Sequence, residues 1–81
     1  MDIKDKIRQF LTTNFYVANA AALSDSQSLL DAGIVDSTGV LEIIAFLETE
    51  FGIEVSNNEM VPENLDAVDN IVGYVARKLG E

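Results

Sequence analysis

The sequence predicts an all-α domain, a four-helix bundle with three longer helices, one short helix and a long first loop. Three stretches repeat apolar residues at helical spacing, and no stretch alternates apolar and polar residues as a half-buried strand does. The chain has 81 residues, 48% of them hydrophobic, which supports one modest core and no second lobe. We therefore expect a single domain over residues 1–81.

The first helix is predicted from Asp2 to Phe15. One face is apolar and the other is charged or polar, which is typical of a helix that packs on a core. The apolar face consists of Ile3, Ile7, Phe10, Leu11 and Phe15. From Tyr16 to Asp36 the periodicity fails and turn-forming residues dominate. A connection this long in so small a domain is unusual and often functional.

We expect this connection to be an ordered loop. Four apolar residues within it, Leu23, Leu29, Leu30 and Ile34, are candidates to hold it against the core. Gly33 allows a backbone turn that other residues resist.

The second helix is predicted from Ser37 to Phe51, and its periodicity is the strongest in the chain. Its core-facing positions are Val40, Ile43, Ile44, Leu47 and Phe51. Glu42 lies on the outward face, and Glu48 does so in part. Gly52 follows at the position where a left-handed residue commonly ends a helix.

The third element is predicted as one or two turns around Glu59 to Val61. Ser56 and Glu59 fit a capping box, and Pro62 follows too soon for a longer helix. Asp66 is the expected N-cap of the last helix. The apolar stripe of that helix consists of Val68, Ile71, Val72, Val75 and Leu79.

Composition excludes several kinds of chemistry. The chain has no Cys and no His, so thiol catalysis, disulfides, zinc sites and imidazole acid–base chemistry are not expected. Five basic and fourteen acidic residues give a net charge of −9, which disfavours nucleic acid and favours basic protein partners. Residues 9–76 contain no basic residue.

No uncharged stretch approaches the roughly 20 apolar residues that a membrane-spanning helix needs. The charged first residues lack the apolar core of a secretory signal. We therefore expect a cytoplasmic protein without a membrane partner.

The dipeptide Asp36-Ser37 lies where the long loop meets the second helix. If Asp36 caps that helix, Ser37 occupies the first helical position with its hydroxyl free. A phosphate attached there would place its charge at the positive end of the helix dipole. No group nearby has the basicity to deprotonate Ser37, so a nucleophilic serine is not expected, and no metal-binding motif is present. The alternative is that the pair merely caps the helix.

Three segments together resemble the acyl and peptidyl carrier proteins. They are Ser28-Leu29-Leu30-Asp31-Ala32-Gly33-Ile34-Val35-Asp36-Ser37, Leu41-Glu42-Ile43-Ile44-Ala45-Phe46-Leu47-Glu48, and Glu50-Phe51-Gly52-Ile53-Glu54-Val55. The resemblance continues through Val61-Pro62-Glu63-Asn64-Leu65 and the last helix, so it covers nearly the whole chain.

The resemblance implies a bundle of the acyl-carrier type and a covalent 4′-phosphopantetheine arm on Ser37. A separate phosphopantetheinyl transferase would attach the arm from coenzyme A with a magnesium ion, and Asp36 would help that enzyme and its metal engage the site. The arm's thiol would hold acyl or aminoacyl cargo as a thioester. The carrier itself is non-catalytic.

The resemblance also implies partners. An acyl- or aminoacyl-activating ligase would load the arm, and downstream transferases or synthases would meet Glu42 and Glu48 through basic patches. Thr38 and Gly39 follow the serine where fatty-acid carriers usually have Leu and an acid, which favours a free-standing carrier of a specialised pathway. Gly39 should weaken the first helical turn and remove one charge from the docking face. We expect a monomer.

Three further hypotheses remain open. Met60 and Val61 either flank a cleft for the cargo or belong to the core, and the core is the expectation. The chain could instead be an unmodified acidic helical adaptor, in which case Ser37→Ala would leave its function intact. A domain excised from a larger synthase is not expected, because the chain begins with Met1 and its ends are compact.

Overall fold

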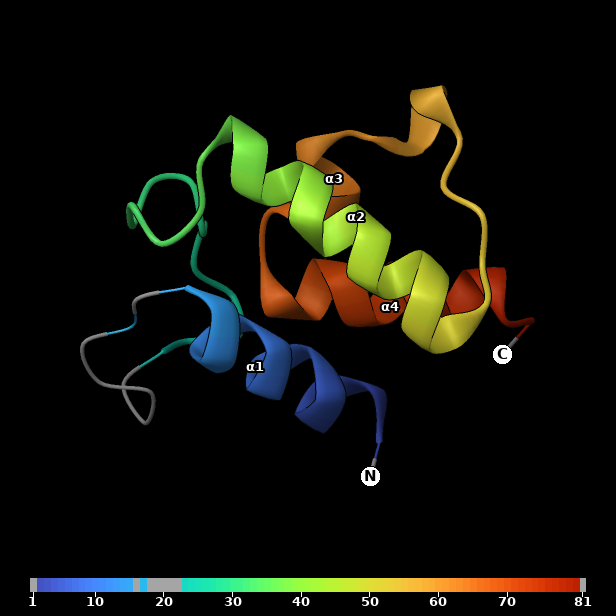
Figure 1. Cartoon of the computed structure of the whole chain (residues 1–81), viewed down its shortest axis with the longest axis horizontal. Helices are drawn as coiled ribbons and strands as arrows, with labels where there is room; N and C mark the ends of the chain where they lie inside the picture. Colours follow the sequence, from blue (N-terminus) through green and yellow to red (C-terminus); the bar gives the residue numbers. More distant parts are fainter. Residues whose placement is uncertain (1, 16, 18–22, 81) are drawn as a thin grey trace.

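The computed structural model describes residues 2–15, 17 and 23–80. Its elements are α1 (Ile3–Asn14), α2 (Ser37–Phe51), a 3-10 turn η2 (Asn57–Glu59), α3 (Pro62–Leu65) and α4 (Val68–Lys78) (Figure 1). No strand is present among the described residues. The predicted all-α fold, with three longer helices, a short helix and a long first loop, is confirmed.

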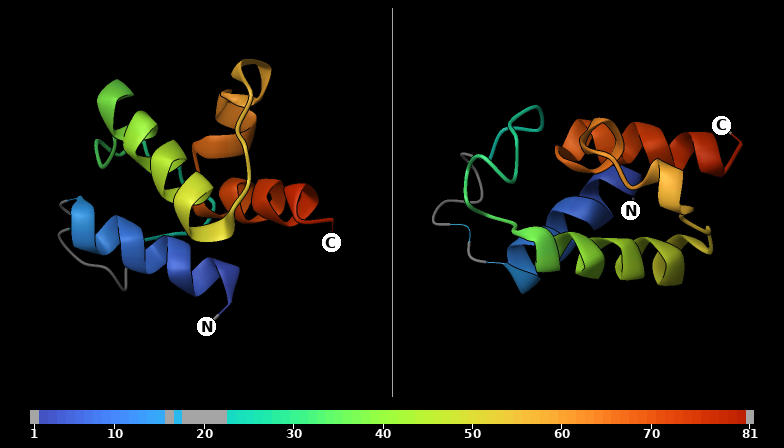
Figure 2. Two further views of the ribbon diagram at one scale, coloured as in Figure 1. Left: turned by 45° about the vertical axis from the view of Figure 1, so that its right-hand side comes forward. Right: turned by 90° about the horizontal axis from the view of Figure 1, so that it is seen from above.

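The helix α1 runs opposite to α2 and α4, and residues 23–36, which lead into α2, lie at one end of the bundle (Figures 1 and 2). The start of α2 lies at that same end. Both described termini lie toward the opposite end. This topology gathers the loop, the first turn of α2 and the segment before α3 around one region.

Most of the core comes from the predicted helical stripes. The stripe of the last helix is wrong at one position, because Leu79 is 42% exposed, whereas Tyr74, which was not predicted, is buried. Each of the three longer helices contributes fully buried residues, because each has one apolar face to remove from water. The largest of these are Ile7, Leu11, Ile43, Leu47, Val68, Ile71, Tyr74 and Val75. Beside this core, the rings of Phe10 and Phe46 stack with centroids 4.2 Å apart, which joins α1 to α2.

The two helix signals at the ends of α2 are confirmed. The Asp36 side chain accepts a hydrogen bond from the N–H of Gly39 at 2.8 Å, which makes Asp36 the N-cap. Gly52 ends the helix with a φ of 67°, in the left-handed region that favours glycine.

The long loop is ordered by several contacts over residues 23–36. Leu23, Leu29 and Val35 are buried, and Gly33 turns the backbone with a φ of 74°. Leu30, which was predicted to face the core, is 42% exposed. The remainder of the predicted connection, Tyr16 and residues 18–22, lies outside the described residues.

The region between α2 and α4 differs from the prediction. Instead of one short element around Glu59 to Val61, η2 ends at Glu59 and α3 begins at Pro62. Proline suits the first helical position because the N–H it lacks would have no partner there. The predicted capping box is present in that the Glu59 carboxylate accepts the N–H of Ser56 at 3.1 Å.

Candidate functional site

Ser37 is the first residue of α2, and its side chain is exposed. Within the described residues its hydroxyl forms no hydrogen bond. Asp36 beside it is exposed and caps the helix through one carboxylate oxygen, Oδ1. The sequence prediction that Asp36 caps α2 and leaves the Ser37 hydroxyl free is therefore confirmed.

Two backbone N–H groups in the first turn of α2, those of Ser37 and Thr38, have no partner among the described residues. The next two are already used: the Asp36 side chain accepts the N–H of Gly39, and the Asp36 carbonyl accepts the N–H of Val40 at 3.0 Å. Free amides at a helix start, together with the helix dipole, favour an anion such as a phosphate.

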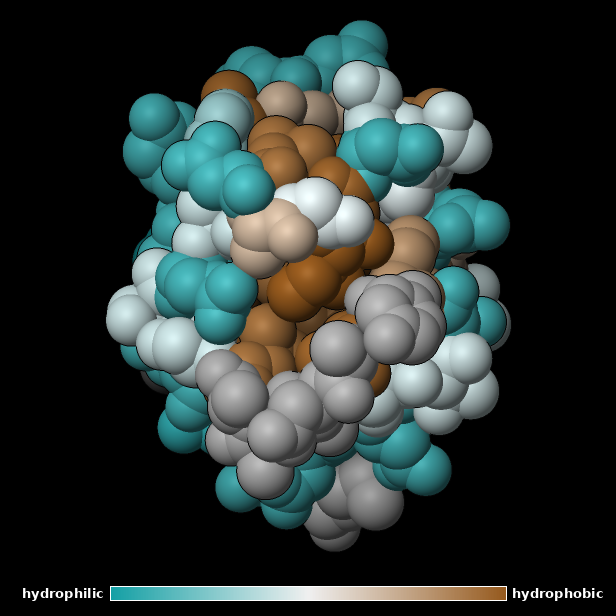
Figure 3. All heavy atoms as spheres, turned by 90° about the vertical axis from the view of Figure 1, so that its left-hand side faces the viewer, coloured by the Kyte–Doolittle hydropathy of each residue, from teal (hydrophilic) through white to brown (hydrophobic). Residues whose placement is uncertain are grey.

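A pocket of about 240 Å³ opens beside Ser37. It lies between the loop, the first turns of α2 and the segment that leads into α3. Apart from Ser37 and Asp66, its lining is apolar and consists of Leu29, Leu30, Val35, Val40, Met60, Val61, Pro62 and Leu65. From the side that carries the loop and the start of α2, apolar atoms form a band bordered by hydrophilic residues (Figure 3).

The core assignment of Met60 and Val61 is wrong. Met60 is 39% exposed and Val61 is half-buried, and both line the pocket. The reason is the separate start of α3 at Pro62: Met60 ends the 3-10 turn η2 and Val61 lies in extended backbone before α3, so neither residue belongs to a helix that packs on the core. The alternative, that they flank a cleft, agrees with the structure.

Asp66 holds the loop wall of this pocket. Its carboxylate accepts hydrogen bonds from the Ser28 hydroxyl and from the N–H of Leu30 at 3.0 Å, and its carbonyl accepts the N–H of Leu29 at 2.7 Å. The prediction that Asp66 caps the last helix is therefore wrong. Ala67 occupies the N-cap position of α4, and the Asp66 carboxylate is committed to the loop instead.

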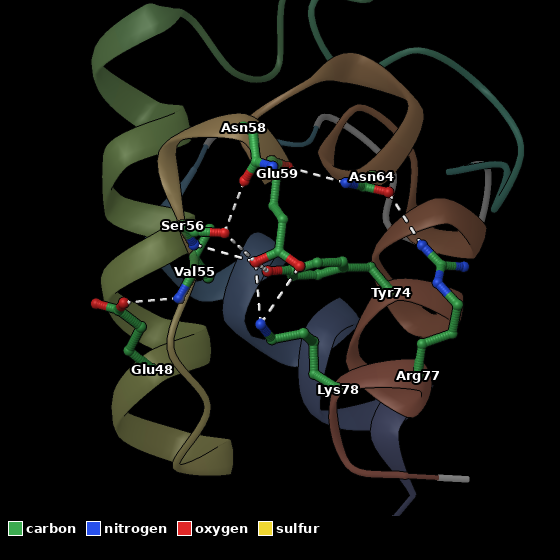
Figure 4. Close-up of polar contacts among 9 residues, drawn as sticks. All are labelled: Glu48, Val55, Ser56, Asn58, Glu59, Asn64, Tyr74, Arg77 and Lys78. Atoms are coloured by element: carbon green, nitrogen blue, oxygen red, sulfur yellow. Dashed lines mark hydrogen bonds and ion pairs between the residues drawn. The ribbon is translucent and has the colours of Figure 1, made fainter.

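Glu59 holds the wall of the pocket that contains Met60. Its carboxylate accepts hydrogen bonds from the N–H and hydroxyl of Ser56, from the Tyr74 hydroxyl at 3.0 Å and from the Lys78 ammonium at 3.0 Å (Figure 4). The Ser56 and Lys78 donors lower the pKa of Glu59 to about 2. Burial and the neighbouring carboxylate raise the pKa of Tyr74 to about 12. We call Ser56, Glu59, Tyr74 and Lys78 the Glu59 cluster. Their hydrogen bonds tie the chain before Met60 to α4.

Gly39 has a role that the sequence did not reveal. It is buried, and a Cβ atom at this position would lie 2.8 Å from Cε1 of Phe15 and 3.0 Å from Cγ1 of Val35. Glycine therefore permits the end of α1 to pack against the first turn of α2. The expectation that Gly39 removes a charge from the docking face is wrong, because this position faces inward.

The two predicted docking residues of α2 are both exposed but differ in their contacts. The carboxylate of Glu42 has no partner among the described residues. The carboxylate of Glu48 accepts the N–H of Val55 at 3.0 Å, which fixes the chain after α2 (Figure 4). Glu50, two residues further along α2, pairs with Lys6 at 3.5 Å.

Over residues 2–15, 17 and 23–80, no group of three or more acidic residues is arranged to hold a metal ion. Over the same residues, no helix has the length and apolar character to cross a membrane.

A small helical fold with an exposed serine at the start of its second long helix, beside an apolar pocket, agrees with the bundle that the resemblance to carrier proteins implies. Curated relatives with that name match nearly the whole chain. The acyl carrier protein of Campylobacter hominis is 32% identical over 75 residues, covering 93% of this chain and 91% of its own. A D-alanyl carrier protein of Streptococcus suis is 31% identical over 75 residues, covering 93% and 92%.

The acyl carrier protein of Solidesulfovibrio magneticus is 26% identical over 81 residues, the full length of both chains. No family model matches the sequence. The chain belongs to the carrier protein family, as the residues around Asp36-Ser37 suggested.

Proposed function

We propose that this chain holds acyl or aminoacyl groups as thioesters on a 4′-phosphopantetheine arm joined to Ser37, and shuttles them between biosynthetic enzymes. The observation that carries the proposal is the exposed Ser37 hydroxyl, uncommitted within the described residues, at the start of α2. The carrier names of the relatives support the general role.

The residues around Ser37 suit such an arm. A phosphate on Ser37 Oγ would lie at the positive end of α2, next to the free amides of Ser37 and Thr38. The apolar pocket beside it offers a surface for the part of the arm or cargo nearest the serine. When bound, the arm supplies a terminal thiol for the thioester, and the chain itself has no cysteine to compete with it.

Ser37 is the acceptor in this reaction and not a catalyst. The chain contains no His, and the only basic residues are those at its two ends, so a separate phosphopantetheinyl transferase has to activate the hydroxyl. The carboxylate of Asp36 uses Oδ1 for the cap, and its exposure leaves it accessible to that transferase and its magnesium ion.

The other proposed partners follow from the same role. They are an acyl- or aminoacyl-activating ligase and downstream transferases or synthases. Glu42 and Glu48 lie on the exposed face of α2, where basic residues of these enzymes would reach them. We place the protein in the cytoplasm as a monomer, without nucleic acid or membrane partners.

The test is incubation of the purified chain with coenzyme A, magnesium and a broad-specificity phosphopantetheinyl transferase, followed by intact mass. The expected result is the gain of one phosphopantetheine and one titratable thiol. Ser37→Ala should gain nothing, whereas Ser26→Ala, another exposed serine in the loop region, should be modified like the parent. Circular dichroism should show that all three chains are equally helical.

The opposing result also has a clear meaning. If several transferases leave the folded chain unmodified, the thioester carrier proposal fails. An unmodified acidic adaptor would then explain the fold, and Ser37→Ala would bind its partners as the parent does.

A further inference from the structure

Asp66 brings a negative charge to a pocket that is otherwise apolar. Of the described residues that line the pocket beside Ser37, eight are apolar, and only Ser37 and Asp66 are polar. Asp66 is half-buried. A carboxylate that is partly withdrawn from water loses hydration, and hydrogen bonds or a cation have to compensate for that loss. The surroundings of Asp66 therefore indicate what can enter the pocket.

Two neutral donors compensate the Asp66 carboxylate in part. Its Oδ1 atom accepts the N–H of Leu30 at 3.0 Å, and its Oδ2 atom accepts the hydroxyl of Ser28. An ionised carboxylate has about four acceptor positions, so each oxygen can accept one more hydrogen bond. Neither donor carries a charge, so these bonds leave the negative charge without a counter-ion.

The basic residues of the described chain do not supply that counter-ion. The four ion pairs among the described residues all use other acids, namely Asp25, Glu50 and Glu59. Arg77 donates instead to the side-chain oxygen of Asn64. A phosphate on Ser37 would add a second negative charge at the edge of the same pocket. A positive group that enters the pocket is therefore attracted, and a negative group is repelled.

We propose that Asp66 selects aminoacyl cargo by accepting hydrogen bonds from the α-ammonium of the group that the arm carries. The apolar lining then contacts the side chain of that amino acid. The pocket volume of about 240 Å³ suits a small side chain, since a cavity of about 150 Å³ holds one benzene molecule. A neutral acyl group of the same shape lacks the contact with Asp66. This inference rests on the proposed carrier function and narrows its cargo.

Three cargos of similar size test the effect of charge alone. They are the alanyl, 2-methylpropanoyl and methylmalonyl groups, which carry an ammonium, a methyl group and a carboxylate on the same carbon. A phosphopantetheinyl transferase attaches each group to Ser37 from a coenzyme A analogue in which an amide replaces the thioester. The amide prevents loss of the cargo by hydrolysis, and intact mass confirms that each chain is loaded.

Thermal unfolding at about pH 6.5, where the ammonium is protonated, gives the first measurement. In the parent chain, the alanyl form should melt about 2–6 °C above the 2-methylpropanoyl form, and the methylmalonyl form should melt lowest. Asp66→Asn should remove most of these differences, because the amide keeps an oxygen for the N–H of Leu30 but has no charge. Asp31→Asn is the control, since Asp31 is an exposed acid of the same loop outside the pocket. It should keep the parent order.

The alanyl ammonium itself gives the second measurement. An α-amino group has a pKa of roughly 7.7–8.0, and a neighbouring carboxylate raises it. NMR titration of a ¹³C-labelled alanyl methyl group should give a pKa about one unit higher in the parent than in Asp66→Asn, which is a tenfold tighter hold on the proton. Asp31→Asn should give the parent value.

Two results would overturn the proposal. One is a 2-methylpropanoyl or methylmalonyl form of the parent that is as stable as the alanyl form. This comparison needs no variant, so it decides the matter even if Asp66→Asn does not fold. The other is an equal ammonium pKa in the parent and in Asp66→Asn, which would place the ammonium out of reach of Asp66. If the parent gains no mass with any analogue, the carrier function itself fails, and the cargo assignment fails with it.

Discussion

Replacing Gly39 by alanine tests whether the start of α2 depends on close packing against α1. Alanine is favoured over glycine inside a helix by about 1 kcal/mol, so an unobstructed position would gain stability. At Gly39 the new Cβ would lie 2.8 Å from Phe15 Cε1 and 3.0 Å from Val35 Cγ1, both closer than ordinary contact. Overpacking of this kind costs about 1–3 kcal/mol. We expect a net loss of about 0.5–2 kcal/mol in the free energy of unfolding.

Gly73 provides the matched control. It lies inside α4, and a Cβ there would meet only the Arg77 Nη1 atom at 3.6 Å, an ordinary contact. Gly73→Ala should therefore raise the free energy of unfolding by about 0.5–1 kcal/mol. Urea unfolding followed by circular dichroism measures both variants. If Gly39→Ala is stabilised as much as Gly73→Ala, Phe15 has moved away at no cost and the packing argument is refuted.

Three further predictions concern the titration of Tyr74, the titration of Glu59 and the effect of salt. The pKa of Tyr74 is raised from 10.0 to about 12. The folded state therefore holds this proton more strongly, and about 2–3 kcal/mol of stability should be lost between pH 10 and 12. Tyr74→Phe should remove that loss. If the variant loses as much stability between pH 10 and 12 as the parent does, other groups are responsible for the loss. The pKa of Glu59 is lowered from 4.5 to about 2, so stability should fall as the pH drops through this range, and less so in Glu59→Gln. Because the net charge is −9, added salt or divalent cations should raise the melting temperature, and a flat or falling series would contradict this.

The sequence predicted the parts of the fold that depend on local pattern. Apolar periodicity located α1, α2 and α4, because the same side chains that set the period form the core. Asp36 and Gly52 were also predicted correctly, since a helix cap is made by residues within one turn of each other. For the same reason the candidate serine could be placed at a helix start with its hydroxyl free.

The errors concern contacts between residues that are distant in the chain. Asp66 has the side chain of a helix cap, but its partners Ser28 and Leu30 lie more than thirty positions away, and no local pattern reveals them. Gly39 looked like a weak helix residue because its neighbour Phe15 comes from another helix. Glu48 is exposed as predicted, but the hydrogen bond that it accepts from the N–H of Val55 had no signal in the local pattern, because Val55 belongs to the chain after Gly52.

These long-range contacts show that the pocket beside Ser37 is held by the whole fold. Asp66, at the end of α3, fixes the loop wall, and the packing of Phe15 on Gly39 fixes the first turn of α2. The wall that contains Met60 is held by the Glu59 cluster on α4. Tyr74 and Lys78 do not line the pocket, yet they anchor the residue that precedes Met60. The position of this wall therefore depends on hydrogen bonds made by α4, a helix whose residues do not line the pocket.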